Sequence, residues 1–248
     1  QNIVDYFEEN KLAYDYQSVT GMPFGVLRGY IAEGLFKDEA DIRQSADQSA
    51  AFGVVRPGDI KYRDVNGDGV INKDDRVPLS YGNNVPRVMF GIGGEFNYKD
   101  FTVSMLFKGN TGVNYYRVGM GYDAGWIPFY NGEMGNVLKI VNNPKNRWIP
   151  SWYSGDPSTE NPNAMFPRLS YGSNNNNSQL STFWKQNGSF LRFQELNFRY
   201  VFRHRKWLRA AGLSALECDF VINNLFTIDS AKYFDPEQAW YNGAAYPI

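Results

Sequence analysis

VMFGIGGEFNYKDFTVSMLFK, residues 88–108, contains two stretches in which apolar side chains alternate with small or polar ones. The apolar sets are Val88, Phe90, Ile92, Phe96 and Tyr98 in 88–98, and Phe101, Val103, Met105 and Phe107 in 100–108. Because successive side chains of a β-strand point to opposite faces, each stretch predicts a strand with one apolar face. The link Tyr98–Asp100 is very short, so the two strands are expected to be antiparallel neighbours.

Two further segments, 190–203 and 213–224, follow the same rule. Their apolar sets are Leu196, Phe198, Tyr200 and Phe202, and Leu216, Cys218, Phe220 and Ile222. Charged and amide side chains occupy the intervening positions, among them Glu95, Arg199, Glu217 and Asp219. The alternation slips near Phe193, which predicts a β-bulge or a part of the strand above a membrane. The sequence therefore predicts an all-β fold with antiparallel strands.

Two architectures use such strands. A β-sandwich turns the apolar face toward a second sheet, whereas a membrane barrel turns it toward lipid and its polar face toward the lumen. Aromatic residues make up 17% of the chain, and long segments (1–87, 109–189, 225–248) alternate with short links. Outer-membrane barrels have short periplasmic turns and long extracellular loops, so we expect a barrel whose long segments are extracellular. Four strands cannot close a barrel, so the chain is expected to be part of a larger one.

DVNGDGVINKDD, residues 64–75, is rich in side-chain oxygen. A calcium loop of the EF-hand type takes ligands from positions 1, 3, 5, 7 and 12 and has Gly at position 6. The corresponding ligands are Asp64, Asn66, Asp68, the carbonyl of Val70, and Asp75. Gly69 stands at position 6, and Ile71 at position 8 is expected to anchor the loop to a core. We expect structural calcium here; the alternative is a polar turn without metal, since position 12 is Asp rather than Glu.

The amino-acid composition excludes several classes of protein function. The formal net charge is -1, which gives no reason to propose a nucleic-acid partner. One Cys and one His exclude a disulfide framework and a Cys-rich zinc site, and no catalytic constellation is readable. No apolar run is long enough for a membrane helix, and the start QNIVDYFEEN lacks a signal-peptide pattern. The chain is therefore expected not to be an enzyme, and to be intracellular or a piece of a longer protein.

Six motifs spread along the chain carry a family resemblance. They are GMPFGVLRGYIAEGLF (21–36), PGDIKYRDVNGDGVINKDDR (57–76), YGNNVPRVMFGIGGEFNYKDF (81–101), RWIPSWYSGDPSTENPNAMFPRL (147–169), FWKQNGSFLRFQELNFRYVF (183–202) and FVINNLFTIDSAKYFDPE (220–237). In these motifs and their order, the chain resembles the C-terminal part of SusC/RagA-type TonB-dependent outer-membrane transporters of Bacteroidetes.

The resemblance implies a roughly 22-stranded, plugged barrel. It also implies a SusD-like surface lipoprotein as partner, and import of oligosaccharides or oligopeptides driven by TonB. The plug domain and the last strand are expected to lie outside this sequence. On this view the other partners are the rest of the barrel and outer-membrane lipid. The competing hypothesis is a secreted, calcium-stabilised β-sandwich that binds carbohydrate.

Tryptophans in the long segments are candidates for substrate contact, because sugars stack on exposed aromatic faces. The candidates are Trp126, Trp148 and Trp152. The alternative is that they pack the loops together or contact the lipoprotein.

Overall fold

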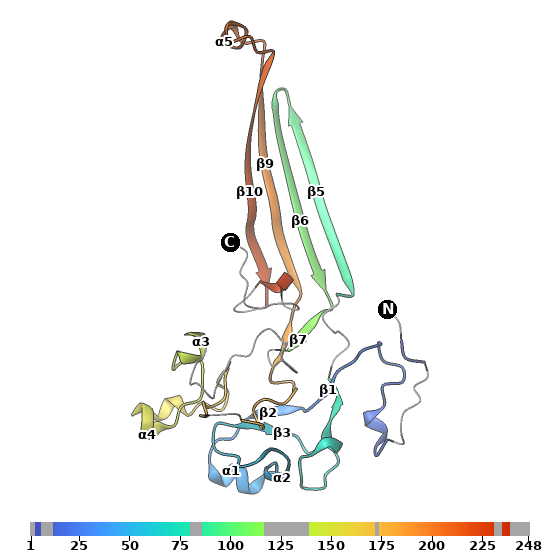
Figure 1. Ribbon diagram of the computed structural model, residues 1–248, viewed down its shortest axis with the longest axis vertical. Helices are drawn as coiled ribbons and strands as arrows, with labels where there is room; N and C mark the ends of the chain where they lie inside the picture. The colour runs from blue at the N-terminus through green and yellow to red at the C-terminus, as the bar shows by residue number, and fades with distance from the viewer. Residues whose placement is uncertain are drawn as a thin grey trace.

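The computed structural model describes residues 3–5, 12–79, 86–116, 139–171, 174–230 and 235–238. A long antiparallel sheet stands on a broader loop module, and the short turns lie at the far end of the sheet (Figure 1). The sheet has the order β10-β9-β6-β5. Its strands are β5 (Val88–Tyr98), β6 (Phe101–Thr111), β9 (Phe190–Arg203) and β10 (Ala215–Asp229). The predicted antiparallel strands are confirmed: β5 and β9 have the predicted bounds, whereas β6 and β10 end three and five residues beyond the predicted ends.

The register places the predicted apolar sets on one face. Val103 pairs with both Phe96 and Phe198, and Phe198 also pairs with Phe220. An apolar row therefore crosses all four strands, and the polar sets fall on the opposite face.

The predicted slip near Phe193 is a β-bulge. On β9, Glu195 pairs with Leu106, but the next pair is Phe193 with Phe107, so Gln194 has no partner in the ladder. The extra residue moves Phe193 onto the apolar face, where its ring stacks on Phe107 with centroids 4.4 Å apart.

No second layer covers the apolar face within the described part of the chain. The side chains of Ile92, Phe96 and Phe220 are 65%, 63% and 64% exposed. The β-sandwich hypothesis requires these rings to pack against another sheet, and the described residues supply no such sheet. Within the same residues, β5 and β10 are the edges of the sheet.

The described parts of segments 1–87 and 112–189 lie at one end of the sheet and form the loop module (Figure 1). Its strand pairs are β1 (Arg28–Gly29) with β4 (Val77–Pro78), β2 (Ala32–Leu35) with β3 (Ile60–Tyr62), and β7 (Asn114–Tyr116) with β8 (Lys185–Asn187). The helices are α1 (Glu39–Gln44), α2 (Ser49–Phe52), α3 (Lys139–Asn142) and α4 (Ser151–Ser154), with α5 (Lys206–Ala210) at the far turn. The 3-10 turns are η1 (Asp15–Gln17), η2 (Lys73–Asp75), η4 (Pro157–Thr159) and η5 (Pro236–Gln238).

None of the helices in the described segments combines the length and the hydropathy needed to span a lipid bilayer.

The loop module has a core of its own. Its central apolar side chains are almost fully buried: Tyr30, Leu35, Ile60, Tyr62, Ile71, Val141, Trp148, Ala164, Phe166 and Trp184. Asp59 is fully buried beside this core and forms an ion pair of 2.8 Å with Arg168. It also accepts hydrogen bonds from the side-chain amides of Asn174 and Asn177, so the asparagine tract 174–177 is a structural part of the module.

Candidate functional site

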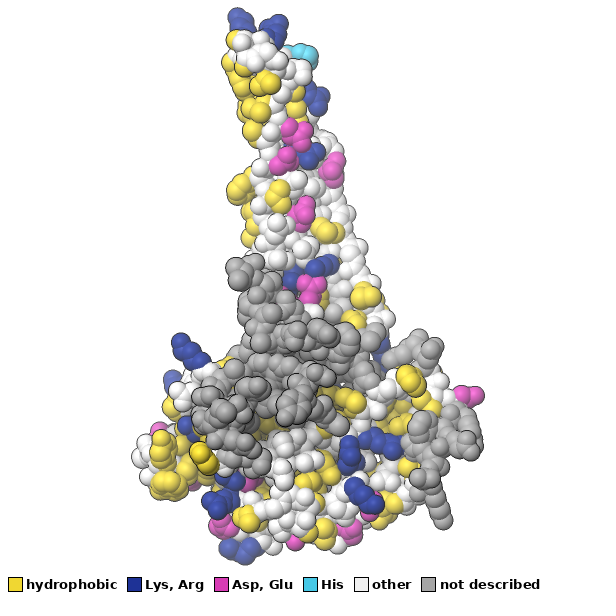
Figure 2. Space-filling view, in the orientation of Figure 1, with side chains coloured by type: hydrophobic (Ala, Val, Ile, Leu, Met, Phe, Trp, Pro, Cys, Tyr) yellow, Lys and Arg dark blue, Asp and Glu magenta, His cyan; other side chains and the backbone are white. Residues whose placement is uncertain are grey.

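The polar face of the sheet carries paired charges. The Arg199 Nε lies 2.8 Å from a carboxylate oxygen of Asp219 and 2.9 Å from one of Glu217. In Figure 2 acidic and basic side chains gather on the front of the upright sheet, while hydrophobic side chains line one flank. Pairing across strands accounts for these charges, since all three side chains point to the same face.

A second charged cluster lies where the sheet meets the loop module. Arg192 is 5% exposed and forms ion pairs with Asp235 (2.6 Å) and Glu237 (2.5 Å), and Glu237 also pairs with Lys108 (2.7 Å). These contacts fasten residues 235–238, which follow β10 in the sequence, onto the polar face. Sequence reasoning missed this cluster, because only the bulge at Gln194 brings Arg192 to that face.

The Asp-rich loop folds around its own backbone amides. The Asp64 carboxylate accepts hydrogen bonds from Gly67 N (2.6 Å) and Gly69 N (2.7 Å). Gly69 has φ of 83°, as the sharp turn at position 6 requires. Asn66 and Asp68 each accept a bond from the backbone N–H two residues ahead, as in Asx turns.

Asp75 closes this loop. Its two carboxylate oxygens accept hydrogen bonds from Val65 N and Asn72 N, both at 2.8 Å. The side chain of Asp75 is fully buried, and Ile71 is fully buried in the core of the module. The prediction that Ile71 anchors the loop to a core is confirmed.

The segment around η1 covers one side of the loop. Tyr16 donates a hydrogen bond to the carbonyl of Asp74 (2.7 Å), and Tyr14 Oη accepts one from Asn66 (3.1 Å). Burial, followed by the negative charge of Asp75, raises the pKa of Tyr16, so its hydroxyl stays protonated and remains a donor.

The chemistry of the loop favours a hard cation, but its carboxylates do not converge. Among the described residues, no group of three or more His, Cys, Asp or Glu side chains is close enough to hold a metal ion. The donor set of the loop is entirely oxygen, which suits calcium. Asp75 is buried and forms no ion pair with the cations of the described residues, and a buried carboxylate without a counter-charge is costly. A cation near the loop would lower that cost.

The candidate tryptophans have different environments. Trp148 is 4% exposed and lies in the core of the module, so it offers no stacking face and the prediction for it is wrong on this point. Trp152 is 83% exposed on α4 and contacts the ring of Tyr153. Trp126 lies outside the described residues.

Comparison with known proteins adds the family context. No family model matches the chain. The sequence is 28% identical over 160 residues to the TonB-dependent receptor P26 of Formosa agariphila; the match covers 63% of this chain and 14% of that receptor.

Solved structures give the fold. The chain is similar to the RagAB peptide importer in its open-open state, with a TM-score of 0.54, 16% identity, and coverage of 88% of this chain and 20% of that one. A second structure, of the RagAB peptide transporter, gives a TM-score of 0.53 at 17% identity and covers 90% of this chain and 21% of that one. At this identity the likeness shows the fold alone.

The chain thus spans about a fifth of the solved chains and less of the receptor. These proteins are a receptor and importers rather than enzymes. The sequence match, the shared antiparallel fold and the two-faced sheet agree with the resemblance noted in the sequence. The sequence match and the shared fold support the resemblance of this chain to a portion of an outer-membrane TonB-dependent transporter of the SusC/RagA type.

Proposed function

We propose that the whole protein imports oligosaccharides or oligopeptides across the outer membrane, using energy transmitted by TonB. The observation that carries this is the sequence match to a TonB-dependent receptor over 160 residues, joined to the fold of an importer chain. The chain supplies strands of the barrel and a module at its mouth. It has no enzymatic role, and its partners include a SusD-like lipoprotein on the cell surface.

Exposure of the sheet supports the membrane part of this proposal. Its apolar face is widely accessible, with Phe220 64% exposed and Ile228 61% exposed. A soluble protein rarely leaves so large an apolar surface open, whereas lipid is its natural solvent. The opposite face looks into the barrel lumen, and the loop module lies outside the cell.

Uptake by the native host tests the transport proposal. Deletion of the full-length transporter is expected to abolish uptake of its oligomeric substrate, and deletion of TonB is expected to do the same. A variant with an intact barrel but a disrupted TonB-contacting segment is the control for loss of the protein itself. Uptake that persists without the transporter, or that does not depend on TonB, would contradict the proposal.

We also propose that residues 64–75 bind calcium and stabilise the loop module. The support is the oxygen-only donor set, the position of Gly69 and the buried charge of Asp75. By mass action, a cation that binds only the folded loop raises its stability as its concentration exceeds the dissociation constant. The predicted ligands are Asp64, Asn66, Asp68, the carbonyl of Val70, and Asp75.

Thermal unfolding of the full-length transporter, first with EGTA and then with excess calcium, tests this. We expect calcium to raise the Tm of the wild type and to have no effect on the variant Asp64→Asn/Asp75→Asn. Asp74→Asn is the matched control, since this neighbouring carboxylate is outside the ligand set. Equal Tm values with and without calcium in the wild type would refute the calcium site, as would a calcium effect that survives in the double variant.

A further inference from the structure

Basic side chains gather at the end of the sheet that lies away from the loop module (Figure 2). Two turns form this end: residues 99–100 join β5 to β6, and residues 204–214, which contain α5, join β9 to β10. Asp100 is the one acid in these two turns, and their basic residues are Lys99, His204, Arg205, Lys206 and Arg209. This end of the sheet is therefore strongly positive, although the formal net charge of the chain is only -1.

An aromatic row crosses the apolar face at the same end. The register pairs Tyr98 with Phe101 and Phe101 with Tyr200, so the three rings lie level on neighbouring strands. Beyond them the ring of Phe202 packs edge-on against Trp207 of α5, with centroids 5.8 Å apart, and Trp207 is 50% exposed. Aromatic side chains on the outer face of a membrane barrel lie at the level of the lipid headgroups.

Two of the cations lie against this aromatic row. Lys99 Nζ is 5.1 Å from the centroid of the Tyr98 ring, and the Arg205 guanidinium donates a hydrogen bond of 3.4 Å to Tyr200 Oη. Both tyrosines belong to the apolar face, so the two cations are held on the side that meets lipid. Arg203, by contrast, follows the polar register of β9 and faces the lumen.

These two cations have no carboxylate partner within the described segments. The nearest acidic side chains along β10, Glu217 and Asp219, pair with Arg199. Arg205 bonds to a neutral phenol and Lys99 lies over a ring, so both keep donors for an anion. A ligand that meets the cations and the aromatic row together has a charged end and an apolar body. An anionic phospholipid has this form, with its phosphate at the headgroup level and its chains along the strands.

We propose that this end of the sheet binds the phosphate of anionic phospholipid in the periplasmic leaflet of the outer membrane. Lys99 and Arg205 bind phosphate groups beside the tyrosines. Lys206 and Arg209 add positive charge, and Trp207 lies among the headgroups. The inference rests on the proposed location in the outer membrane and names the lipid class that contacts one end of the barrel.

Native mass spectrometry of the purified full-length transporter with its partner lipoprotein tests this. The complex is taken from micelles that contain equal amounts of phosphatidylglycerol and phosphatidylethanolamine with the same acyl chains, and the lipids that remain bound are measured. The wild type is expected to retain more of the anionic lipid. Lys99→Gln/Arg205→Gln is expected to lower the ratio of anionic to zwitterionic lipid at least about fivefold, the effect of one cation near an anionic surface. Lys99→Arg/Arg205→Lys is expected to keep it.

Lys37→Gln/Lys145→Gln, at two exposed lysines of the loop module, is the matched control and is expected to leave the ratio unchanged. Circular dichroism on each variant establishes that the barrel is folded. Equal retention of both lipids by the wild type overturns the inference, as does a ratio that Lys99→Gln/Arg205→Gln leaves unchanged.

A different partner would give a different result. If the wild type retains both lipids equally and Lys99→Gln/Arg205→Gln loses TonB-dependent uptake in the host, the cations bind an acidic periplasmic protein, which also overturns the inference. A wild type that retains neither lipid overturns the membrane location as well, so failure of the lipid preference and failure of the proposed function are read from different outcomes.

Discussion

The sheet and the loop module treat apolar side chains in opposite ways. In the module, Phe166 is fully buried and Trp184 is 1% exposed, whereas Phe96 and Phe220 of the sheet are more than 60% exposed. The module builds its core from segments distant in the sequence and satisfies its polar groups internally. The sheet leaves several large apolar side chains exposed on one face, where another medium has to cover them. One chain thus contains a part that folds as soluble proteins do and a part that needs lipid.

The largest effect is expected at Asp59, where the module behaves most like a soluble core. Asp59→Ala leaves Arg168 without its carboxylate and removes acceptors for Asn174 and Asn177. Breaking a buried ion pair in this way costs about 3–5 kcal/mol. Hydrogen exchange of the full-length transporter is expected to show the module opening while β9 stays protected. Asp15→Ala, at an exposed carboxylate, is expected to leave hydrogen exchange unchanged. If the module exchanges equally in both variants, the buried Asp59 does not stabilise it more than an exposed carboxylate does.

A charge on the lipid side of the sheet is the next largest perturbation. Phe220→Arg places a guanidinium on the apolar face, which costs about 2–4 kcal/mol near the bilayer midplane. Val221→Arg places the same group on the polar face of the same strand and is expected to cost far less. Unfolding of each variant by urea in lipid vesicles measures the difference between their free energies of unfolding. If both variants are equally stable, the apolar face does not meet lipid.

Gly58→Ala tests how tightly the module is packed. Gly58 has φ of 85°, and an added Cβ would lie 2.3 Å from the Trp148 ring. Overpacking of this kind costs about 1–3 kcal/mol beyond the strain of the left-handed backbone. Gly155→Ala isolates the strain of the left-handed backbone, because Gly155 has φ of 73° and ψ of 4° and an added Cβ there would meet nothing within 4 Å. Thermal unfolding of both variants is the measurement, and equal losses would mean that Trp148 moves aside freely.

The smallest expected effect is the pH dependence of the Asp41–Lys61 ion pair, 2.9 Å long. Burial opposes ionisation of Asp41, but hydrogen bonds from the Lys61 side chain and from Lys37 N outweigh it and lower the pKa of Asp41 below its usual value of 3.8. Its stabilisation is therefore present above that value and is lost as the pH falls through the lowered pKa.

The pair is partly exposed, so it contributes at most about 1 kcal/mol. The stability difference between wild type and Asp41→Asn is expected at neutral pH and should vanish in acid. A difference that is unchanged in acid would mean that the ionised carboxylate is not responsible.

The sequence predicted the sheet far better than the module. Strand alternation is local, so the faces, the neighbours and even the slip near Phe193 are readable without tertiary information. The module depends on contacts between distant segments, such as Asp59 with Asn177, and no local pattern announces them. The strands β1 and β4 are two residues long, below what periodicity can detect.

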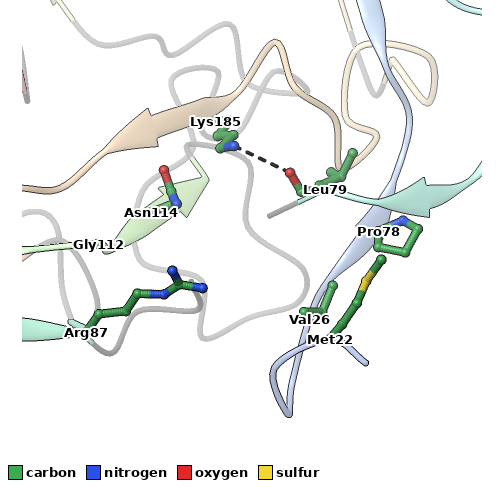
Figure 3. A pocket seen from close by; sticks show the side chains of 8 residues that line it. All are labelled: Met22, Val26, Pro78, Leu79, Arg87, Gly112, Asn114 and Lys185. Atoms are coloured by element: carbon green, nitrogen blue, oxygen red, sulfur yellow. Dashed lines mark hydrogen bonds between the residues drawn. The ribbon is translucent and has the colours of Figure 1, made fainter. Parts of the chain in front are cut away.

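The difference between local patterns and contacts of distant segments also explains which site residues could be predicted. Ile71 was predicted to be buried because its position within the loop motif requires an anchor. For Trp148 both substrate contact and loop packing were open, because composition alone cannot tell a buried ring from an exposed one, and the ring is buried. Lys185 and Arg87 are far apart in the sequence, and both line one cavity between the module and the sheet (Figure 3), which no local pattern predicts.

The bulge at Gln194 has a mechanical consequence. If Gln194 were absent, Phe193 would follow Glu195 in unbroken alternation and every side chain of β9 would keep its present face, in step with β6. The side chains on either side of Gln194 are therefore already in phase with β6, whereas strict alternation counted through Gln194 would exchange the faces of Phe193 and Arg192; the extra residue also bends the strand. A single inserted residue thus bends the strand where the sheet meets the loop module, and deleting it is expected to remove that bend while every side chain keeps its face.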